Sequence, residues 1–245
     1  MATILIGVAL DLLLRLIPGI PRDLDFAIPM LAVAAIAPFL VACARRFIDR
    51  VPGFEPGLAL SRTALPHFLT GLATGVAVII AADAVCVAVG AAAWHLTLPP
   101  DHLIPFVLGP LLAQAVPEEL WYRGYLFRNL TAALPPRTSF ALTTLAFGAN
   151  HILSNSDATG IGEKLLYVVQ AVALGALLLA CRVIGGNLWL PIGAHTGHNM
   201  AAETMIAYIP GLYGVLLLIE TIAMIVTAAI LLVNRRSLCS TTITW

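Results

Sequence analysis

The chain has 245 residues, of which 60% are hydrophobic and only 11% are charged, with 13 basic and 13 acidic side chains. Soluble domains carry about a quarter charged residues, so this composition excludes an ordinary soluble enzyme. The zero net charge and the scattered basic residues exclude a nucleic-acid-binding protein. We therefore expect an integral membrane protein whose surface contacts lipid.

Apolar segments follow one another along the whole chain. A hydrocarbon core of about 30 Å requires roughly 20 mostly apolar helical residues. The segments that come near this criterion are 3–18, 26–44, 67–95, 103–133, 138–154, 164–184, 188–206 and 211–233. The first is short and carries Asp11 and Arg15, so it could instead lie in the membrane interface. The predicted fold class is all-α, a polytopic bundle of about eight transmembrane helices that forms one domain over residues 1–245.

The distribution of basic residues predicts the orientation of the chain. With eight spans and both termini inside, most arginines fall in cytoplasmic loops, whereas Arg22 and Lys164 fall outside. Lysine and arginine accumulate on the cytoplasmic side of membrane proteins. Together with the high alanine content and the preference for arginine over lysine, this pattern indicates the inner membrane of a prokaryote, with both termini cytoplasmic.

Two G-x-x-x-G patterns occur in predicted spans, at Gly71 and Gly75 and at Gly193 and Gly197. Small residues at this spacing allow two helix backbones to approach closely. We interpret both patterns as sites of helix packing.

A first polar cluster, Glu118, Glu119 and Arg123, interrupts segment 103–133. Ionisable groups inside spans cost roughly 2.5–3.5 kcal/mol each on insertion scales, so such clusters indicate functional sites. Glu119 and Arg123 are four residues apart, and we expect them to pair on one helix face. Glu118 points about 100° away from that pair, which leaves it without a partner on its own helix and suits a general base.

A second cluster, Asn150 and His151, ends the next span. The two spans are joined by a turn at Pro135–Pro136. Counted from Pro135, Glu118 lies 17 residues back and His151 lies 16 residues forward. In an antiparallel hairpin both side chains reach the same depth, roughly 25 Å from the turn. The spacing therefore predicts that a carboxylate and an imidazole lie level with each other.

A third cluster lies in segment 188–206. His195 and Asn199 stand at i, i+4 and line one helix face, whereas His198 could join that face or point elsewhere. Together the three clusters offer a base for water, imidazoles that orient water or hold a metal, and an amide donor for an oxyanion. Peptide-bond hydrolysis within the membrane fits this set, and the sequence contains neither H-E-x-x-H nor G-x-S-x-G.

The sequence resembles the CAAX protease and bacteriocin-processing family of intramembrane endopeptidases, also called the abortive-infection family. Three motifs match in order: E-E-x-x-x-R at 118–123, F-x-x-x-H at 147–151 and H-x-x-x-N at 195–199. The flanking residues 123–126 and 186–191 are also similar, and the resemblance covers about residues 105–200.

The resemblance implies a membrane fold whose site lies in a cavity between the core helices, with a catalytic core at about 103–206. Glu118 would activate water with His151 as its partner, and His195 and Asn199 would bind the oxyanion. Glu119 and Arg123 would form a structural pair that supports the site. Asn150 and His198 are polar where family members commonly carry apolar residues, which predicts a wetter or differently tuned site.

The need for a metal stays open at this point. Glu118, His151 and His195 could supply a His2Glu set typical of catalytic zinc, although their spacing shows no compact metal-ligand pattern. A Glu-His pair could also activate water without an ion. We favour the reaction without a cofactor, because Glu118 acts as a base only when it is not a ligand, and we keep zinc as the alternative.

The resemblance also implies the partners, namely membrane lipid and a protein or peptide substrate. Eukaryotic family members remove the last three residues of prenylated CAAX proteins, whereas bacterial members are linked to bacteriocin maturation, self-immunity or regulation. A prenylated C-terminus is therefore one option for the substrate. Two other functions compete with proteolysis: a transporter whose buried Glu and His residues relay protons, and a catalytically idle immunity or scaffold protein.

Overall fold

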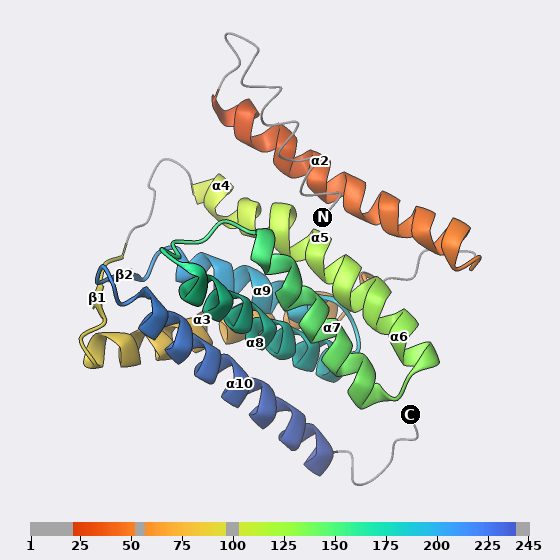
Figure 1. The fold of residues 1–245 in the computed structure, drawn as a ribbon. Helices are drawn as coiled ribbons and strands as arrows, with labels where there is room; N and C mark the ends of the chain where they lie inside the picture. Colours follow the sequence, from red (N-terminus) through yellow and green to blue (C-terminus); the bar gives the residue numbers. More distant parts are fainter. Residues whose placement is uncertain (1–21, 52–56, 97–102, 239–245) are drawn as a thin grey trace.

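The computed structural model describes residues 22–51, 57–96 and 103–238, which fold into a helix bundle (Figure 1). The α-helices are α2 (Arg22–Cys43), α3 (Ala64–Ala88), α4 (Leu103–Leu108), α5 (Val116–Glu119), α6 (Phe127–Ala133), α7 (Pro136–Asn150), α8 (Ile161–Gly185), α9 (Trp189–Ala202) and α10 (Tyr213–Leu238). The π-helical segments are η1 (Ala44–Ile48), η2 (Gly109–Ala115) and η3 (Leu120–Leu126), and η4 (His151–Leu153) is a 3-10 turn. The predicted all-α class is confirmed, with one short strand pair added.

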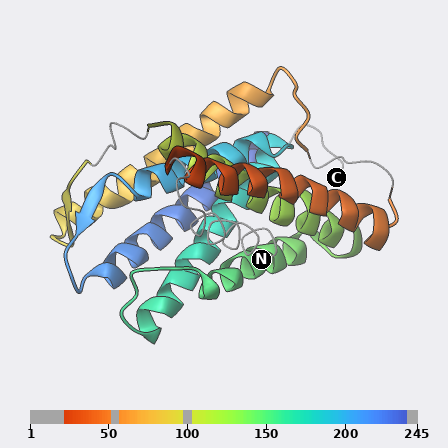
Figure 2. The same ribbon diagram turned by 90° about the horizontal axis from the view of Figure 1, so that it is seen from above.

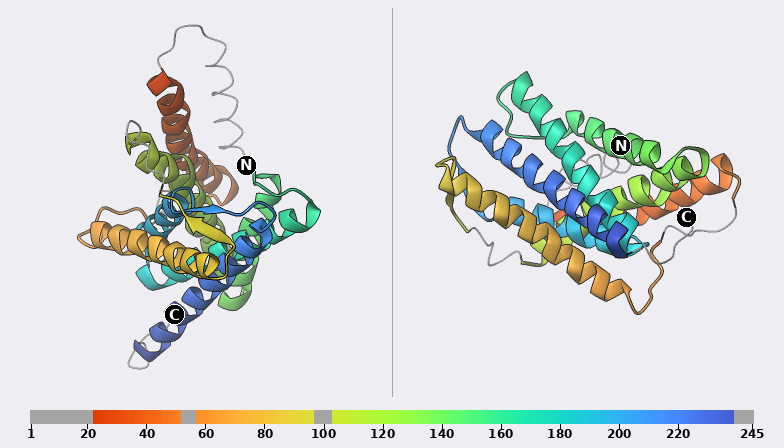
Figure 3. Two further views of the ribbon diagram at one scale, coloured as in Figure 1. Left: turned by 90° about the vertical axis from the view of Figure 1, so that its left-hand side faces the viewer. Right: turned by 90° about the horizontal axis from the view of Figure 1, so that it is seen from below.

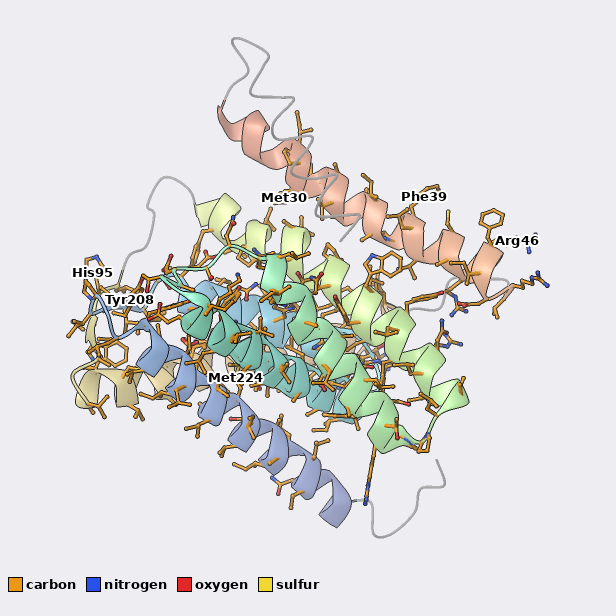
Figure 4. All side chains as sticks on the ribbon, in the orientation of Figure 1. Met30, Phe39, Arg46, His95, Tyr208 and Met224 are labelled. Atoms are coloured by element: carbon orange, nitrogen blue, oxygen red, sulfur yellow. The ribbon has the colours of Figure 1, made fainter. Side chains whose placement is uncertain are left out.

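Four helices are long and apolar enough to cross a membrane: Ile28–Ile48, Ala64–Ala88, Ile161–Gly185 and Tyr213–Asn234. Their outer surfaces carry large apolar side chains. Phe39, for example, is 66% exposed on the outer side of α2 (Figure 4), and Val85 and Ile225 are exposed on α3 and α10. An apolar surface of this extent suits lipid rather than water. These features indicate an integral membrane protein.

The prediction of eight crossings is supported for these four segments only. Segments 138–154 and 188–206 contain α7 and α9, which have 15 and 14 residues. Helices of that length rise only about 22 Å, less than the thickness of a hydrocarbon core. Segment 103–133 is a helical run built from several short elements. Segment 3–18 lies outside the described residues, so the remaining crossings stay a prediction.

A short antiparallel strand pair replaces the ends of two predicted spans. β1 (Ala92–Trp94) pairs with β2 (Ile206–Tyr208), with Ala93 opposite Ala207. α3 ends at Ala88, and Gly90 in the turn that follows has a φ of 75°, which suits glycine better than any other residue. The predicted segments 67–95 and 188–206 therefore ran too far, because an apolar run alone does not separate helix from strand. The labelled Tyr208 marks this end of the molecule in Figure 4.

The glycine patterns mark the closest helix contact of the bundle. Gly71 and Gly75 on α3 lie against the backbone of α9, and Gly193 and Gly197 on α9 lie against the backbone of α3. A Cβ atom at any of these four positions would collide with a backbone carbonyl oxygen. The packing interpretation is therefore confirmed, and it fixes α9 against α3.

The remaining long helices enclose the segments that carry the polar clusters. α10 runs beside α3 and α8 (Figure 3), and its Met224 is fully buried. α2 lies over the helical run 103–133 on the opposite side (Figure 2), where Val41 packs with Leu120 and Ile192. The polar clusters on the 103–133 run, α7 and α9 are thus held inside a shell of apolar helices.

Candidate active site

Glu118, Glu119 and Arg123 lie on an irregular helix. The four-residue α5 carries both glutamates and is flanked by η2 and η3. Pro110 and Pro117 lie within this run and lack the backbone N–H that an α-helix uses, which disturbs the regular ladder. Single π-helical turns are frequent at functional sites. The run therefore presents its charged side chains from a locally widened helix.

Glu119 and Arg123 form the ion pair that their spacing predicts. The Arg123 guanidinium donates from Nη1 to Oε1 of Glu119 at 2.9 Å, and both side chains are fully buried. Nη2 donates to the carbonyl oxygen of Gly175 on α8 at 2.9 Å. The guanidinium carbon lies 4.4 Å from the centre of the Phe147 ring, a cation–π contact. Arg123 thus joins the 103–133 run to α8 and α7.

His195 bridges the two glutamates. Its Nδ1 lies 3.0 Å from Oε1 of Glu119, and its Nε2 lies 3.9 Å from Oε2 of Glu118. The Glu119 carboxylate only accepts hydrogen bonds, so the Nδ1 of His195 must carry the proton that it donates. Glu119 therefore positions His195 as well as pairing with Arg123. The sequence did not reveal this contact, because 76 residues separate its two partners.

His151 is fixed in a similar way. Its Nδ1 donates to the carbonyl oxygen of Phe147 at 2.9 Å, one helical turn back along α7. Its ring also packs on the Phe147 ring, with centroids 4.7 Å apart. The Nε2 atom of His151 is therefore the nitrogen that remains to bind water or substrate.

A cavity of about 1120 Å³ collects the predicted catalytic residues. Its lining contains Glu118, His151, His195 and Asn199, and also Asn150 and His198. Glu118 and His151, which the hairpin spacing predicts to lie at the same depth, both line this cavity. The face predicted for His195 and Asn199 also lines it, and His198 joins them. The volume is sufficient for a peptide segment.

Asn199 is held by two partners. Its Nδ2 donates to Oε1 of Gln114, and its Oδ1 accepts from Nδ1 of His198 at 3.0 Å. An amide nitrogen has two hydrogens, so one N–H of Asn199 remains for a ligand. Sequence reasoning missed Gln114, although its position four residues before Glu118 places it on the same helix face.

The proposed zinc ligands do not form a ligand set. Within residues 22–51, 57–96 and 103–238, no three His, Cys, Asp or Glu side chains are grouped closely enough to hold a metal ion. Glu118 and His195 are close, but the arrangement does not bring His151 in as a third ligand. The described side chains therefore do not form a zinc ligand set in this arrangement.

Residues 100–201 match the family model described as Type II CAAX prenyl endopeptidase Rce1-like. A comparison with curated proteins found no match. The matched segment includes Glu118, His151, His195 and Asn199, and the bounds of the catalytic core at 103–206 stay a prediction. Residues 100–201 of this chain therefore form a domain of the Rce1-like type II CAAX prenyl endopeptidase family.

Proposed function

We propose that the protein is an intramembrane endopeptidase that hydrolyses a peptide bond of a membrane-associated protein or peptide. The observation that supports this most strongly is the continuous set of contacts from Arg123 through Glu119 and His195 to Glu118 at the cavity wall. Ionisable groups inside a membrane bundle are expensive to bury, so their assembly in one cavity indicates a function.

The charges of this set can balance. When His195 is an imidazolium, its charge and that of Arg123 offset the two carboxylates of Glu118 and Glu119. Oε2 of Glu118 has no hydrogen-bond partner, although it is shielded from solvent. This oxygen is therefore the basic atom that the set leaves for a proton from water.

The proposed reaction uses these atoms in two steps. Oε2 of Glu118 takes a proton from water while the water oxygen attacks the peptide carbonyl carbon, and Nε2 of His151 orients that water. The oxyanion accepts hydrogen bonds from the remaining N–H of Asn199 and from Nε2–H of His195. The C–N bond then breaks, and Glu118 returns the proton to the leaving nitrogen.

The decisive assay uses the purified full chain in liposomes with matched prenylated and unmodified peptides, and reads the products by mass spectrometry. We expect cleavage at one internal bond. Faster cleavage of the prenylated peptide would assign the CAAX class of substrate, whereas equal rates would assign membrane-associated peptides in general. Proton flux without cleavage of any peptide would overturn the proposal in favour of a transporter.

The proposed reaction needs no metal ion. We expect chelators to have no lasting effect on cleavage. Elemental analysis that finds about one zinc per chain, with activity lost to chelator and restored by zinc, would make Glu118 a ligand and overturn its role as base.

We also propose that both termini lie on the cytoplasmic side of a prokaryotic inner membrane, as the arginine distribution supports. Reporter fusions to the C-terminus test this orientation. A reporter that is active only in the periplasm would contradict it.

A further inference from the structure

Two carboxylic side chains outside the proposed catalytic set are buried where α3 packs against α10. Asp83 and Glu220 are only 1% and 5% exposed. Glu220 lines the cavity and accepts a hydrogen bond at 2.9 Å from Nε2 of Gln170. Neither carboxylate oxygen of Asp83 has a hydrogen-bond partner, and Asp83 lies on α3, the helix that packs against α10. Buried carboxylates are costly unless a cation or donors accompany them.

The rest of the cavity offers no such cation. Asp157 and Glu203 add two more carboxyl groups to the lining, and among the described residues that line the cavity there is no lysine or arginine. The charges of His195 and Arg123 can offset those of Glu118 and Glu119. The other carboxyl groups of the lining therefore have no lysine or arginine partner there.

The basic side chains near the cavity are engaged elsewhere. The Lys164 ammonium donates to the carbonyl oxygen of Ser154 and to the hydroxyl of Ser156, and it lies 4.9 Å from the centre of the Tyr167 ring. Arg123 faces Glu119 and the Gly175 carbonyl. Neither cation belongs to the cavity lining.

His198 provides an independent sign that the cavity takes a hydrogen-bond donor. The residue is 6% exposed and lines the cavity. Its Nδ1 donates to Oδ1 of Asn199, so in the neutral imidazole Nε2 carries a lone pair. This Nε2 is buried without a partner. It can be satisfied by an N–H donor from a ligand.

We propose that the cavity selects a peptide with a lysine or arginine side chain near the scissile bond, and that Glu220, supported by Asp83, binds this charge. The inference rests on the proposed endopeptidase function and names its substrate class. A cationic side chain supplies the charge that the buried carboxylates lack, and its N–H groups match the free acceptors.

The test uses the full chain in liposomes with lipid-anchored peptides that differ at one position. Lysine, acetyl-lysine or glutamate is placed in turn at each position within three residues of the cleaved bond. At one position we expect kcat/KM for lysine to exceed that for acetyl-lysine by about 30-fold, which corresponds to about 2 kcal/mol for a buried charge pair.

Three variants test which residues cause the preference for the lysine peptide over the acetyl-lysine peptide. Glu220→Gln keeps the side-chain shape and should reduce cleavage of the lysine peptide to the level of the acetyl-lysine peptide. Asp83→Asn should weaken the preference in the same direction. Glu163→Gln is the matched control, because Glu163 lies in the first turn of α8, accepts hydrogen bonds from Thr159 and is outside the cavity lining. It should leave the preference unchanged.

The outcomes separate the inference from the proposed function. Equal cleavage of all peptides, a preference for glutamate, or a lysine preference that survives Glu220→Gln would overturn the inference and leave the endopeptidase intact. If no peptide is cleaved, the proposed function fails. Binding of fluorescent lysine and acetyl-lysine peptides then decides the inference: tighter binding of lysine that is lost in Glu220→Gln supports the subsite, and equal binding refutes it.

Discussion

The two faces of α9 serve opposite purposes. One face carries Gly193 and Gly197, which have no side chain and rest on the backbone of α3. The other face carries His195, His198 and Asn199, which line the cavity. The first face stabilises the bundle by close contact, whereas the second buries polar groups that reduce stability unless they are bonded. Rigid packing on one side of the helix thus holds the polar side in position, as a preorganised site requires.

From this comparison we expect the largest loss of stability when one of the two paired charges of Glu119 and Arg123 is removed, because this pair supports the polar face of α9. Glu119→Ala and Arg123→Ala each leave a buried partner charge alone, at a cost of about 3–5 kcal/mol. Both variants should melt earlier in detergent. If either variant kept the thermal stability of wild type while losing all activity, that residue would belong to the catalytic group.

Asn199→Ala should affect turnover and leave the fold nearly unchanged. If its amide donates to an oxyanion, the interaction exists mainly in the transition state, and its loss lowers kcat by about 100- to 1,000-fold. Steady-state kinetics should show little change in KM. A raised KM at unchanged kcat would instead make Asn199 a residue that positions the substrate.

In contrast to Asn199→Ala, Gly193→Ala should lower the stability of the fold, because it disturbs the packed face of α9. The new Cβ would collide with the Phe68 carbonyl oxygen, and such overpacking costs about 1–3 kcal/mol. Gly162→Ala is the matched control, because a Cβ at Gly162 on α8 would meet no other atom within 4 Å. Thermal melts should separate the two variants. Equal melting temperatures would show that the glycine contact does not fix α9.

The smallest effect is expected at Gln114, which only supports Asn199. Gln114→Ala removes one hydrogen bond, so a loss of about 1 kcal/mol, roughly fivefold in kcat, is expected. Gln114→Glu keeps an acceptor oxygen for Nδ2 of Asn199 and should retain most of the activity. If both variants lost activity equally, the hydrogen bond would not be the reason.

The sequence was most informative where a contact is local or follows a regular spacing. The pairing of Glu119 with Arg123 and the glycine contacts of α9 both follow from i, i+4 periodicity. Glu118 and His151 both line one cavity, in agreement with the equal rise of two helices counted from the turn at Pro135.

Contacts between distant segments could not be predicted in this way. The bond from His195 to Glu119 and the burial of Asp83 with Glu220 depend on how α3, α9 and α10 pack against the other helices. Hydropathy also overstated the length of α9, because apolar residues resume at Met205 after its end and continue into β2. Such features come from tertiary packing, which a periodic pattern does not encode.

The most direct test of the account is cleavage in water enriched in oxygen-18. Glu118→Gln keeps the shape of the side chain and removes its basicity. We predict that wild-type protein in liposomes releases a product whose new carboxyl group carries one labelled oxygen. Glu118→Gln should unfold at nearly the wild-type temperature and lose about 100- to 10,000-fold in rate. Labelled product formed at an undiminished rate by Glu118→Gln would contradict the assignment of Glu118 as the base.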